Sequence, residues 1–195
     1  MMDYYAKNFE ILRDAVQSID ESVYVRLIEE CYNVIENGGK IIASGLGKNV
    51  PICEKFVGTM NSYGIPANFL HTNTAVHGDL GIVKKEDLVI LLSKSGNTSE
   101  TIVLAHHLKM KKCKSWAITF DRSAKVCPLV DENLIMNLEH EGDQWNVVPN
   151  NSTTVYLIVL QGIAVELSKR LGITREQFGE NHPGGNIGKV LGVKL

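Results

Sequence analysis

Hydrophobic residues recur at two different spacings along this chain of 195 residues. Within residues 1–38 they return every three or four positions, which predicts two amphipathic helices before the glycine pair Gly38-Gly39. Beyond that pair, short apolar runs alternate with polar, glycine-containing loops and with longer helical stretches. This alternation predicts an α/β protein in which strands and helices follow one another in turn.

The apolar runs are the predicted strands of a sheet. They lie at residues 40–44, 67–71, 87–93, 114–120 and 133–138. Most are apolar throughout rather than alternating, as expected when helices cover both faces of a parallel sheet. The predicted helices among them lie at residues 49–63, 98–111 and 151–171. Because an open parallel sheet binds its ligands beyond the carboxyl ends of the strands, the loops at those ends are the candidate functional segments.

Composition narrows the class of protein. With 44% hydrophobic and 22% charged residues, the chain has the make-up of one globular domain. Lys and Arg number 20 against 22 Asp and Glu, which leaves no basic footprint for a nucleic acid. Charged residues interrupt the N-terminal stretch and no run of about 18 apolar residues follows, so we expect no signal peptide, no membrane span and a cytoplasmic location. Four cysteines without paired spacing predict neither a disulfide framework nor a structural metal.

The first loop at a strand end, residues 44–49, reads Ser-Gly-Leu-Gly-Lys-Asn. Its glycines let the backbone approach a ligand, and Lys48 offers a positive charge to an anion or to a developing oxyanion. The spacing matches neither G-x-G-x-x-G nor a Walker loop, which argues against a nucleotide. Taken alone, such a loop is more often an ordinary turn than a site.

The second loop, residues 93–100, reads Ser-Lys-Ser-Gly-Asn-Thr-Ser-Glu and opens a predicted helix. Its hydroxyls, its glycine and the helix N-terminus make a cradle suited to a phosphate monoester. Asn97 and Glu100 also have the spacing of a capping box, so capping explains Glu100 as well as chemistry does. The number of hydroxyls exceeds what a cap requires.

Further chemistry-bearing residues follow the other strands. Two histidines and an aspartate, His77 among them, lie within the nine positions 71–79, which begin at the last residue of the second strand; His-Gly-Asp alone is usually a turn. They favour an acid/base group over a metal site, because no second cluster of ligands is near in sequence. Glu141 lies in the polar stretch after the last strand, and His182 stands in a glycine-rich tail, His-Pro-Gly-Gly-Asn-Ile-Gly.

The motifs G-L-G-K, H-G-D-L-G, L-S-K-S-G-N-T-S-E, P-N-N-S-T-T and H-P-G-G-N-I-G, in this order, resemble those of sugar isomerase (SIS) domains. More narrowly, they resemble the arabinose-5-phosphate isomerases, and the resemblance covers about residues 38–192. It implies a single SIS domain across residues 1–195, with N-terminal helices at 1–38 and an active-site tail at 174–195. The implied fold is a flavodoxin-like three-layer sandwich in which helices flank a five-stranded parallel sheet, in agreement with the five apolar runs.

The same resemblance implies a function. The family interconverts ribulose 5-phosphate and arabinose 5-phosphate through an enediol, in the synthesis of the lipopolysaccharide sugar Kdo or of capsule sugars. The substrate phosphate would be held by Ser44, Ser93, Ser95 and Thr98. The family's polar active-site positions match Lys48, His77, Glu100, Glu141 and His182.

These matches imply a division of roles. Lys48 would stabilise the enediolate, and His77 would serve in ring opening or in orienting the sugar hydroxyls. The base is one of Glu100, Glu141 and His182, among which the sequence does not choose. We expect a phosphosugar as the ligand, with no cofactor and no metal.

Three departures from the family pattern bear on the substrate. Asn49 stands where the family usually has Ser, Lys94 stands where it usually has Asn, and residues 142–146 replace an A-C-P-L-G stretch. The family commonly carries a C-terminal pair of CBS domains; this chain has none, so we expect no nucleotide-sensing module. An isomerase of another ketose phosphate and a non-catalytic phosphosugar sensor remain the alternative functions.

The tail predicts an assembly. His182 follows the last long helix in a segment with too little apolar content to form a layer of its own, so we expect a neighbouring chain to hold it. SIS isomerases of this kind are typically homotetramers with a histidine contributed across an interface. We therefore expect a homotetramer with shared sites, or failing that a dimer, packed through the N-terminal helices and the apolar face of residues 155–171.

Overall fold

The computed structural model describes residues 2–192. In chain order its main elements are α1 (Met2–Gln17), α2 (Glu21–Glu36), β1 (Ile41–Gly45), α3 (Asn49–Ser62), β2 (Ala67–His71), β3 (Leu88–Leu92), α4 (Ser99–Lys111), β4 (Lys114–Thr119), β5 (Glu132–Ile135), α5 (Asn151–Arg170), α6 (Arg175–Glu180) and α7 (Asn186–Val190). Short 3-10 helices lie at Ala75–His77, Asp79–Ile82 and Cys127–Leu129.

All five strands pair in parallel, in the order β2-β1-β3-β4-β5. The predicted five-stranded parallel sheet is therefore confirmed. The predicted bounds agree with the first four strands to within one residue, while the fifth ends at Ile135 instead of residue 138. The chain runs from β1 outward to β2 and then returns to β3 on the other side of β1. This reversal leaves a crevice at the carboxyl ends of β1 and β3.

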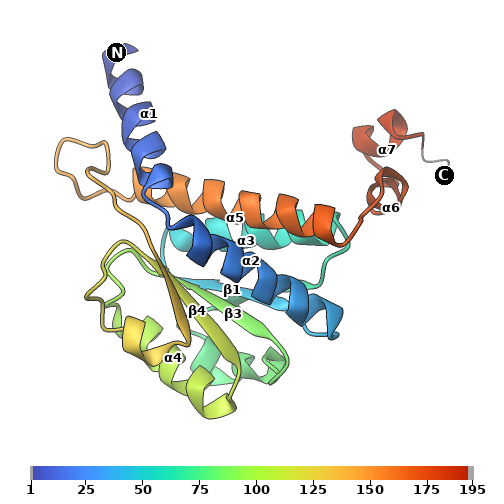
Figure 1. Cartoon of the computed structure of the whole chain (residues 1–195), viewed down its shortest axis with the longest axis horizontal. Helices are drawn as coiled ribbons and strands as arrows, with labels where there is room; N and C mark the ends of the chain where they lie inside the picture. Colours follow the sequence, from blue (N-terminus) through green and yellow to red (C-terminus); the bar gives the residue numbers. More distant parts are fainter. Residues whose placement is uncertain (1, 193–195) are drawn as a thin grey trace.

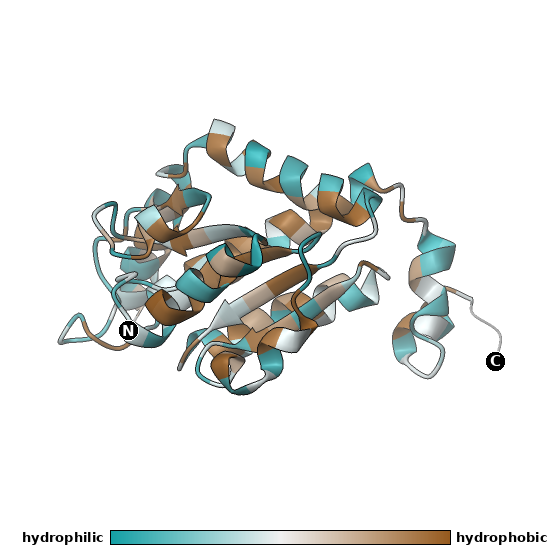
Figure 2. Ribbon diagram, turned by 90° about the horizontal axis from the view of Figure 1, so that it is seen from below, coloured by the Kyte–Doolittle hydropathy of each residue, from teal (hydrophilic) through white to brown (hydrophobic). Residues whose placement is uncertain are grey.

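Helices cover both faces of the sheet. Ile41 and Ile90 belong to the apolar cluster shared with α2, α3 and α5, whereas Ile42, Val89 and Leu91 belong to the cluster under α4. Figure 1 shows α2, α3 and α5 on one side of the strands and α4 on the other. Figure 2 shows hydrophobic residues along the strands and on the helix faces turned toward them. Within residues 2–192, no helix is both long and apolar enough to cross a membrane.

The cysteines serve as small apolar residues. Cys31, Cys53 and Cys113 are buried free thiols, and Cys127 is half-buried. Burial raises the pKa of the Cys53 and Cys113 thiols to about 12. These groups therefore stay protonated and unreactive at neutral pH.

The tail lies at the opposite end of α5 from the carboxyl-end loops. Figure 1 shows α6 and α7 beyond the last turn of α5. Phe178 of α6 packs on Tyr63, with ring centroids 5.3 Å apart. The Asn181 side-chain amide donates a hydrogen bond to the Ser62 carbonyl at 3.2 Å. The tail is thus held against the end of α3.

Candidate active site

A pocket of about 260 Å³ opens between the loops that follow β1 and β3, with the start of α5 as a third wall. It lies in the crevice expected where the strand order reverses. Four of the residues selected from the sequence line it together: Lys48, Ser93, Ser95 and Thr98. The other lining residues are Leu46, Asn49, Leu92, Lys94, Thr101, Pro149 and Ser152.

The loop between β3 and α4 is held in place by the segment that follows β4. The Lys94 carbonyl accepts a hydrogen bond from the Phe120 N–H at 3.0 Å, and the Gly96 carbonyl accepts one from the Val126 N–H at 3.1 Å. Gly96 has a φ of +58°, and a Cβ added there would overlap the Ala124 Cβ. The loop therefore needs glycine at this position, both for its conformation and for its close approach to a neighbouring segment.

Hydroxyl and N–H groups converge at the start of α4. Ser93 is buried, Ser95 is exposed, and Thr98 is the N-cap residue. The Thr98 side chain makes no capping hydrogen bond, so the N-cap side chain leaves the N-terminal N–H groups of α4 uncapped. A helix N-terminus carries partial positive charge, and with these hydroxyls it suits an anion such as a phosphate.

The capping box that the spacing of Asn97 and Glu100 allowed is not formed. The N-cap is Thr98 instead, and the Asn97 side-chain oxygen accepts a hydrogen bond from the Lys125 N–H at 3.0 Å. Glu100 accepts a hydrogen bond from the Ser99 hydroxyl at 2.8 Å. Its own backbone N–H and this hydroxyl lower the pKa of the Glu100 carboxyl below its usual value. Glu100 lies in the first turn of α4, outside the lining of the pocket.

Lys48 presents a charge to the pocket that no carboxylate neutralises within residues 2–192. The adjacent Asn49 side chain donates to the Leu92 carbonyl at 3.2 Å and so ties the loop after β1 to the end of β3. Ser44 lies elsewhere. It is buried on β1 outside the pocket lining, and its hydroxyl shares a 2.9 Å hydrogen bond with the Thr72 hydroxyl.

Glu141 is fully buried at the start of α5. Its Oε2 accepts hydrogen bonds from the N–H groups of Asn150 and Ser152 at 3.1 and 2.9 Å, so it caps a helix that its own N-cap side chain leaves uncapped. Its Oε1 lies 2.6 Å from the Lys94 ammonium. The Glu141 N–H donates to the Asn146 side-chain oxygen at 2.8 Å, which holds the backbone at Glu141 in place.

The two selected histidines lie apart from the pocket lining. His77 is exposed in the short helix after β2, the strand beside β1. His182 lines a hollow with residues from the C-terminal half of α3. Lys48 precedes that helix of 14 residues, so about 20 Å of helix separates it from the end where His182 lies. His182 therefore does not reach the pocket of its own chain.

His182 is nevertheless held in a defined orientation. Its Nδ1 lies 2.7 Å from the Phe178 carbonyl. Because a carbonyl only accepts hydrogen bonds, Nδ1 carries a proton, and the lone pair of the neutral imidazole is therefore on Nε2. The ring packs on Phe178 with centroids 4.4 Å apart. The tail thus presents an imidazole with a free basic nitrogen at a site remote from its own pocket.

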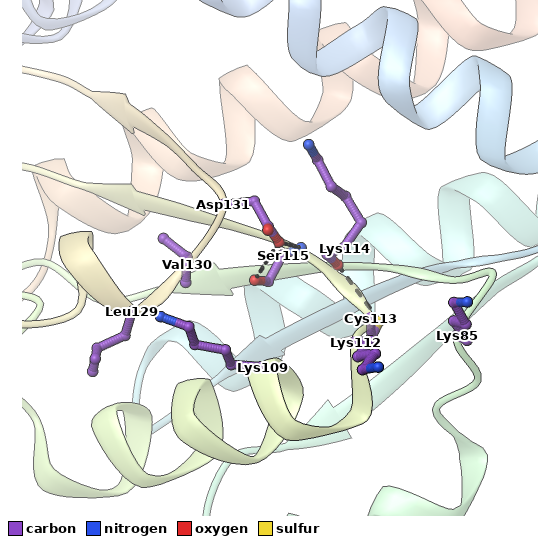
Figure 3. A pocket seen from close by; sticks show the side chains of 9 residues that line it. All are labelled: Lys85, Lys109, Lys112, Cys113, Lys114, Ser115, Leu129, Val130 and Asp131. Carbon is purple, nitrogen blue, oxygen red and sulfur yellow. Dashed lines mark hydrogen bonds between the residues drawn. The ribbon is translucent and has the colours of Figure 1, made fainter.

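A second hollow, of about 440 Å³, lies at the opposite edge of the sheet, near the end of α4 (Figure 3). Four lysines line it, but their ammonium groups do not converge, and Lys114 turns away to pair with Glu30 at 3.1 Å. The Asp131 carboxylate, bonded to the N–H and hydroxyl of Ser115, lies in its wall and disfavours an anion. Within residues 2–192, no cluster of three His, Cys, Asp or Glu side chains could hold a metal ion.

The sequence is similar to those of known proteins. The SIS domain family matches residues 35–166. The arabinose 5-phosphate isomerase KdsD of Pseudomonas aeruginosa is 31% identical over 183 residues, which are 94% of this chain and 56% of that protein. The chain thus spans a little over half the length of the curated relatives it matches.

Solved structures agree over nearly the whole chain. A protein of Escherichia coli CFT073 in complex with arabinose 5-phosphate superposes with a TM-score of 0.85 at 31% identity, covering 92% of this chain and 94% of its own. A candidate sugar-phosphate isomerase of Listeria monocytogenes also superposes with a TM-score of 0.85, at 28% identity, covering 94% of this chain and 96% of its own.

Proposed function

The chain belongs to the SIS domain family, and from that premise we propose that it is a phosphosugar aldose–ketose isomerase. The proposed reaction interconverts ribulose 5-phosphate and arabinose 5-phosphate through an enediol, for Kdo or capsule sugar synthesis. The observation that carries the proposal is the pocket in which a hydroxyl-lined helix N-terminus and the unneutralised Lys48 lie together. The similarity to the KdsD isomerases and to a protein solved with arabinose 5-phosphate supports the same substrate.

The proposed phosphate site is the start of α4. The hydroxyls of Ser93, Ser95 and Thr98 and the N–H groups of the first helical turn donate to the phosphate oxygens. Ser44 supports this loop indirectly in the proposal, because it is buried on β1 outside the lining of the pocket. Anchoring the phosphate places the other end of the sugar toward the loop that carries Lys48.

The chemistry at that end is the transfer of one proton between C1 and C2. The transfer needs a base, and it needs a donor for the negative charge that develops on oxygen. Lys48 supplies the donor in this proposal. His77, on the neighbouring loop after β2, serves in ring opening or in orienting the sugar hydroxyls.

The contacts of the three proposed bases favour one of them for this proposal. Both oxygens of Glu141 are engaged, and the hydrogen bonds of Glu100 weaken it as a base. The Nε2 of His182 has a free lone pair but lies at the far end of α3. We therefore assign the proton transfer to His182 contributed by a second copy of the chain, with Glu100 as its acid–base partner.

Turnover of ribulose 5-phosphate tests the proposed function. We expect NMR spectra of the purified protein with this substrate to show arabinose 5-phosphate accumulating to an equilibrium mixture. Conversion of a ketohexose or ketoheptose phosphate in its place would keep the reaction and replace the substrate, since pockets discriminate weakly between chain lengths. Binding of all these sugars without conversion of any would identify a sensor and contradict the proposal.

Ser95→Ala tests the phosphate site separately. We expect KM for the phosphosugar to rise by about tenfold with kcat little changed, because one hydrogen bond to a charged group is lost. Ser22→Ala, an exposed serine at the start of α2, is the matched control and keeps the wild-type KM. If both Ser93→Ala and Ser95→Ala keep the wild-type kinetics, this loop only caps the helix and does not bind the phosphate.

A further inference from the structure

Lys94 occupies a position that the proposed mechanism leaves unused. It lies between the two serines of the phosphate loop and lines the pocket with them. Its side chain is 43% exposed, and its carbonyl is anchored by the Phe120 N–H. This pocket therefore carries an ammonium group in addition to that of Lys48.

That ammonium is paired with a carboxylate that depends on it. Glu141 is 0% exposed, and its Oε2 is satisfied by two backbone N–H groups of α5. Its Oε1 accepts no hydrogen bond within residues 2–192, and its charge partner is the Lys94 ammonium, 2.6 Å away. The pair therefore joins the phosphate loop to the α5 wall of the pocket, where Ser152 and Pro149 lie.

From this arrangement we propose that Lys94 and Glu141 act as one charge-paired unit that sets how strongly the pocket attracts an anion. Glu141 neutralises the ammonium of Lys94, so that Lys94 adds no net positive charge beside the phosphate site. Lys94 is thus a positioning residue rather than a free phosphate ligand. The proposal rests on the proposed function only in taking the start of α4 as the phosphate site.

The pairing predicts effects of opposite sign when either member is removed. Without Lys94, the carboxylate of Glu141 loses its charge partner beside the pocket, and its negative charge opposes an incoming phosphate. Without the charge of Glu141, the ammonium of Lys94 turns to the pocket and attracts the phosphate. A purely structural role predicts instead that both substitutions loosen the same contact and weaken binding alike.

The test is titration of the full-length protein with inorganic phosphate, followed by calorimetry. Lys94→Met should weaken the affinity by about tenfold, and Glu141→Gln should leave it unchanged or strengthen it. The double variant Lys94→Met/Glu141→Gln should return toward the wild-type value. Lys109→Met, a lysine in the remote hollow of Figure 3, is the matched control and should not change the affinity.

Two results would overturn the proposal: weaker binding in both single variants with no recovery in the double variant, or wild-type binding by Lys94→Met. If Glu141→Gln does not fold, the comparison of Lys94→Arg with Lys94→Met tests the proposal. Lys94→Arg keeps the positive charge and should bind phosphate like the wild type, whereas Lys94→Met should not. Phosphate binding requires no turnover. If the variants show this pattern of phosphate affinities but the protein isomerises no sugar, the proposed charge pair stands and only the proposed reaction is contradicted.

Discussion

Equal mixtures of His182→Ala and Lys48→Ala protein are expected to regain activity that neither variant has alone. Each single variant lacks one group that the proposed reaction needs, so each should lose nearly all of kcat. In a mixed oligomer, some sites combine the intact Lys48 of one chain with the intact His182 of another. Random assembly would make about a quarter of the sites complete, and activity should recover in that proportion.

The reason lies in the length of α3. Lys48 precedes the first turn of this helix and His182 packs beside its other end, about 20 Å away. The tail that carries His182 is held by the contact of Phe178 with Tyr63 and by the hydrogen bond from Asn181 to the Ser62 carbonyl, so folding back onto its own pocket would break these contacts. A neighbouring molecule is the simpler source of the imidazole.

The mixing experiment has internal controls. His106→Ala, an exposed histidine on α4, should keep full activity and shows that losing a histidine is not in itself harmful. Native mass spectrometry of the mixture should show exchanged subunits, and sedimentation should show a tetramer. A monomer, or no recovery of activity in demonstrably mixed oligomers, would mean that His182 serves no neighbouring site.

Gly96→Ala is expected to damage both the stability and the ligand site. An alanine at φ +58° is strained, and its Cβ would overlap Ala124 and crowd the Val126 side chain. Strain and overpacking together should lower the free energy of unfolding by about 2–4 kcal/mol. Because Gly96 lies between Ser95 and Thr98, displacing it should also raise KM for the phosphosugar.

Gly172→Ala separates strain from overlap. Gly172 has a φ of +64°, but an added Cβ there would meet no atom within 4 Å. The free energy of unfolding of this variant should fall by only about 1 kcal/mol. Its KM should stay at the wild-type value, because Gly172 follows α5, far from the pocket. Urea denaturation measures both free energies. Equal decreases in the free energy of unfolding of the two variants would show that the contact with Ala124 does not constrain the phosphate loop.

The fold could be predicted because its signal is local. Ile41, Ile42 and the run Leu88–Leu92 are buried on both faces of the sheet, and such strands are continuously apolar in sequence. The loops that follow these strands could be selected as candidate site segments, because parallel strands bring their carboxyl ends to one edge of the sheet. Lys48 and the serines of the second loop consequently line one pocket in the structure.

What could not be predicted depends on contacts between distant segments. Lys94 follows β3, and Glu141 lies in the segment between β5 and α5. The two side chains meet only in the folded chain, and no spacing in the sequence indicates the pair. The same is true of Asn97, whose partner Lys125 lies on the segment after β4, so its resemblance to a capping residue was misleading. Ser44 was selected as a phosphate ligand by motif, and the structure places it on β1 outside the lining of the pocket, hydrogen-bonded to Thr72.

The most direct test of the proposed reaction is isotope exchange. With ribulose 5-phosphate in deuterium oxide, we expect NMR to show arabinose 5-phosphate carrying solvent deuterium at C2, because a base that removes the proton as an enediol forms exchanges it with water. Lys48→Ala should abolish this incorporation while the protein still binds inorganic phosphate. Incorporation at C2 that requires Lys48 is the result this account predicts; sugar binding with neither conversion nor deuterium at C2 would contradict it.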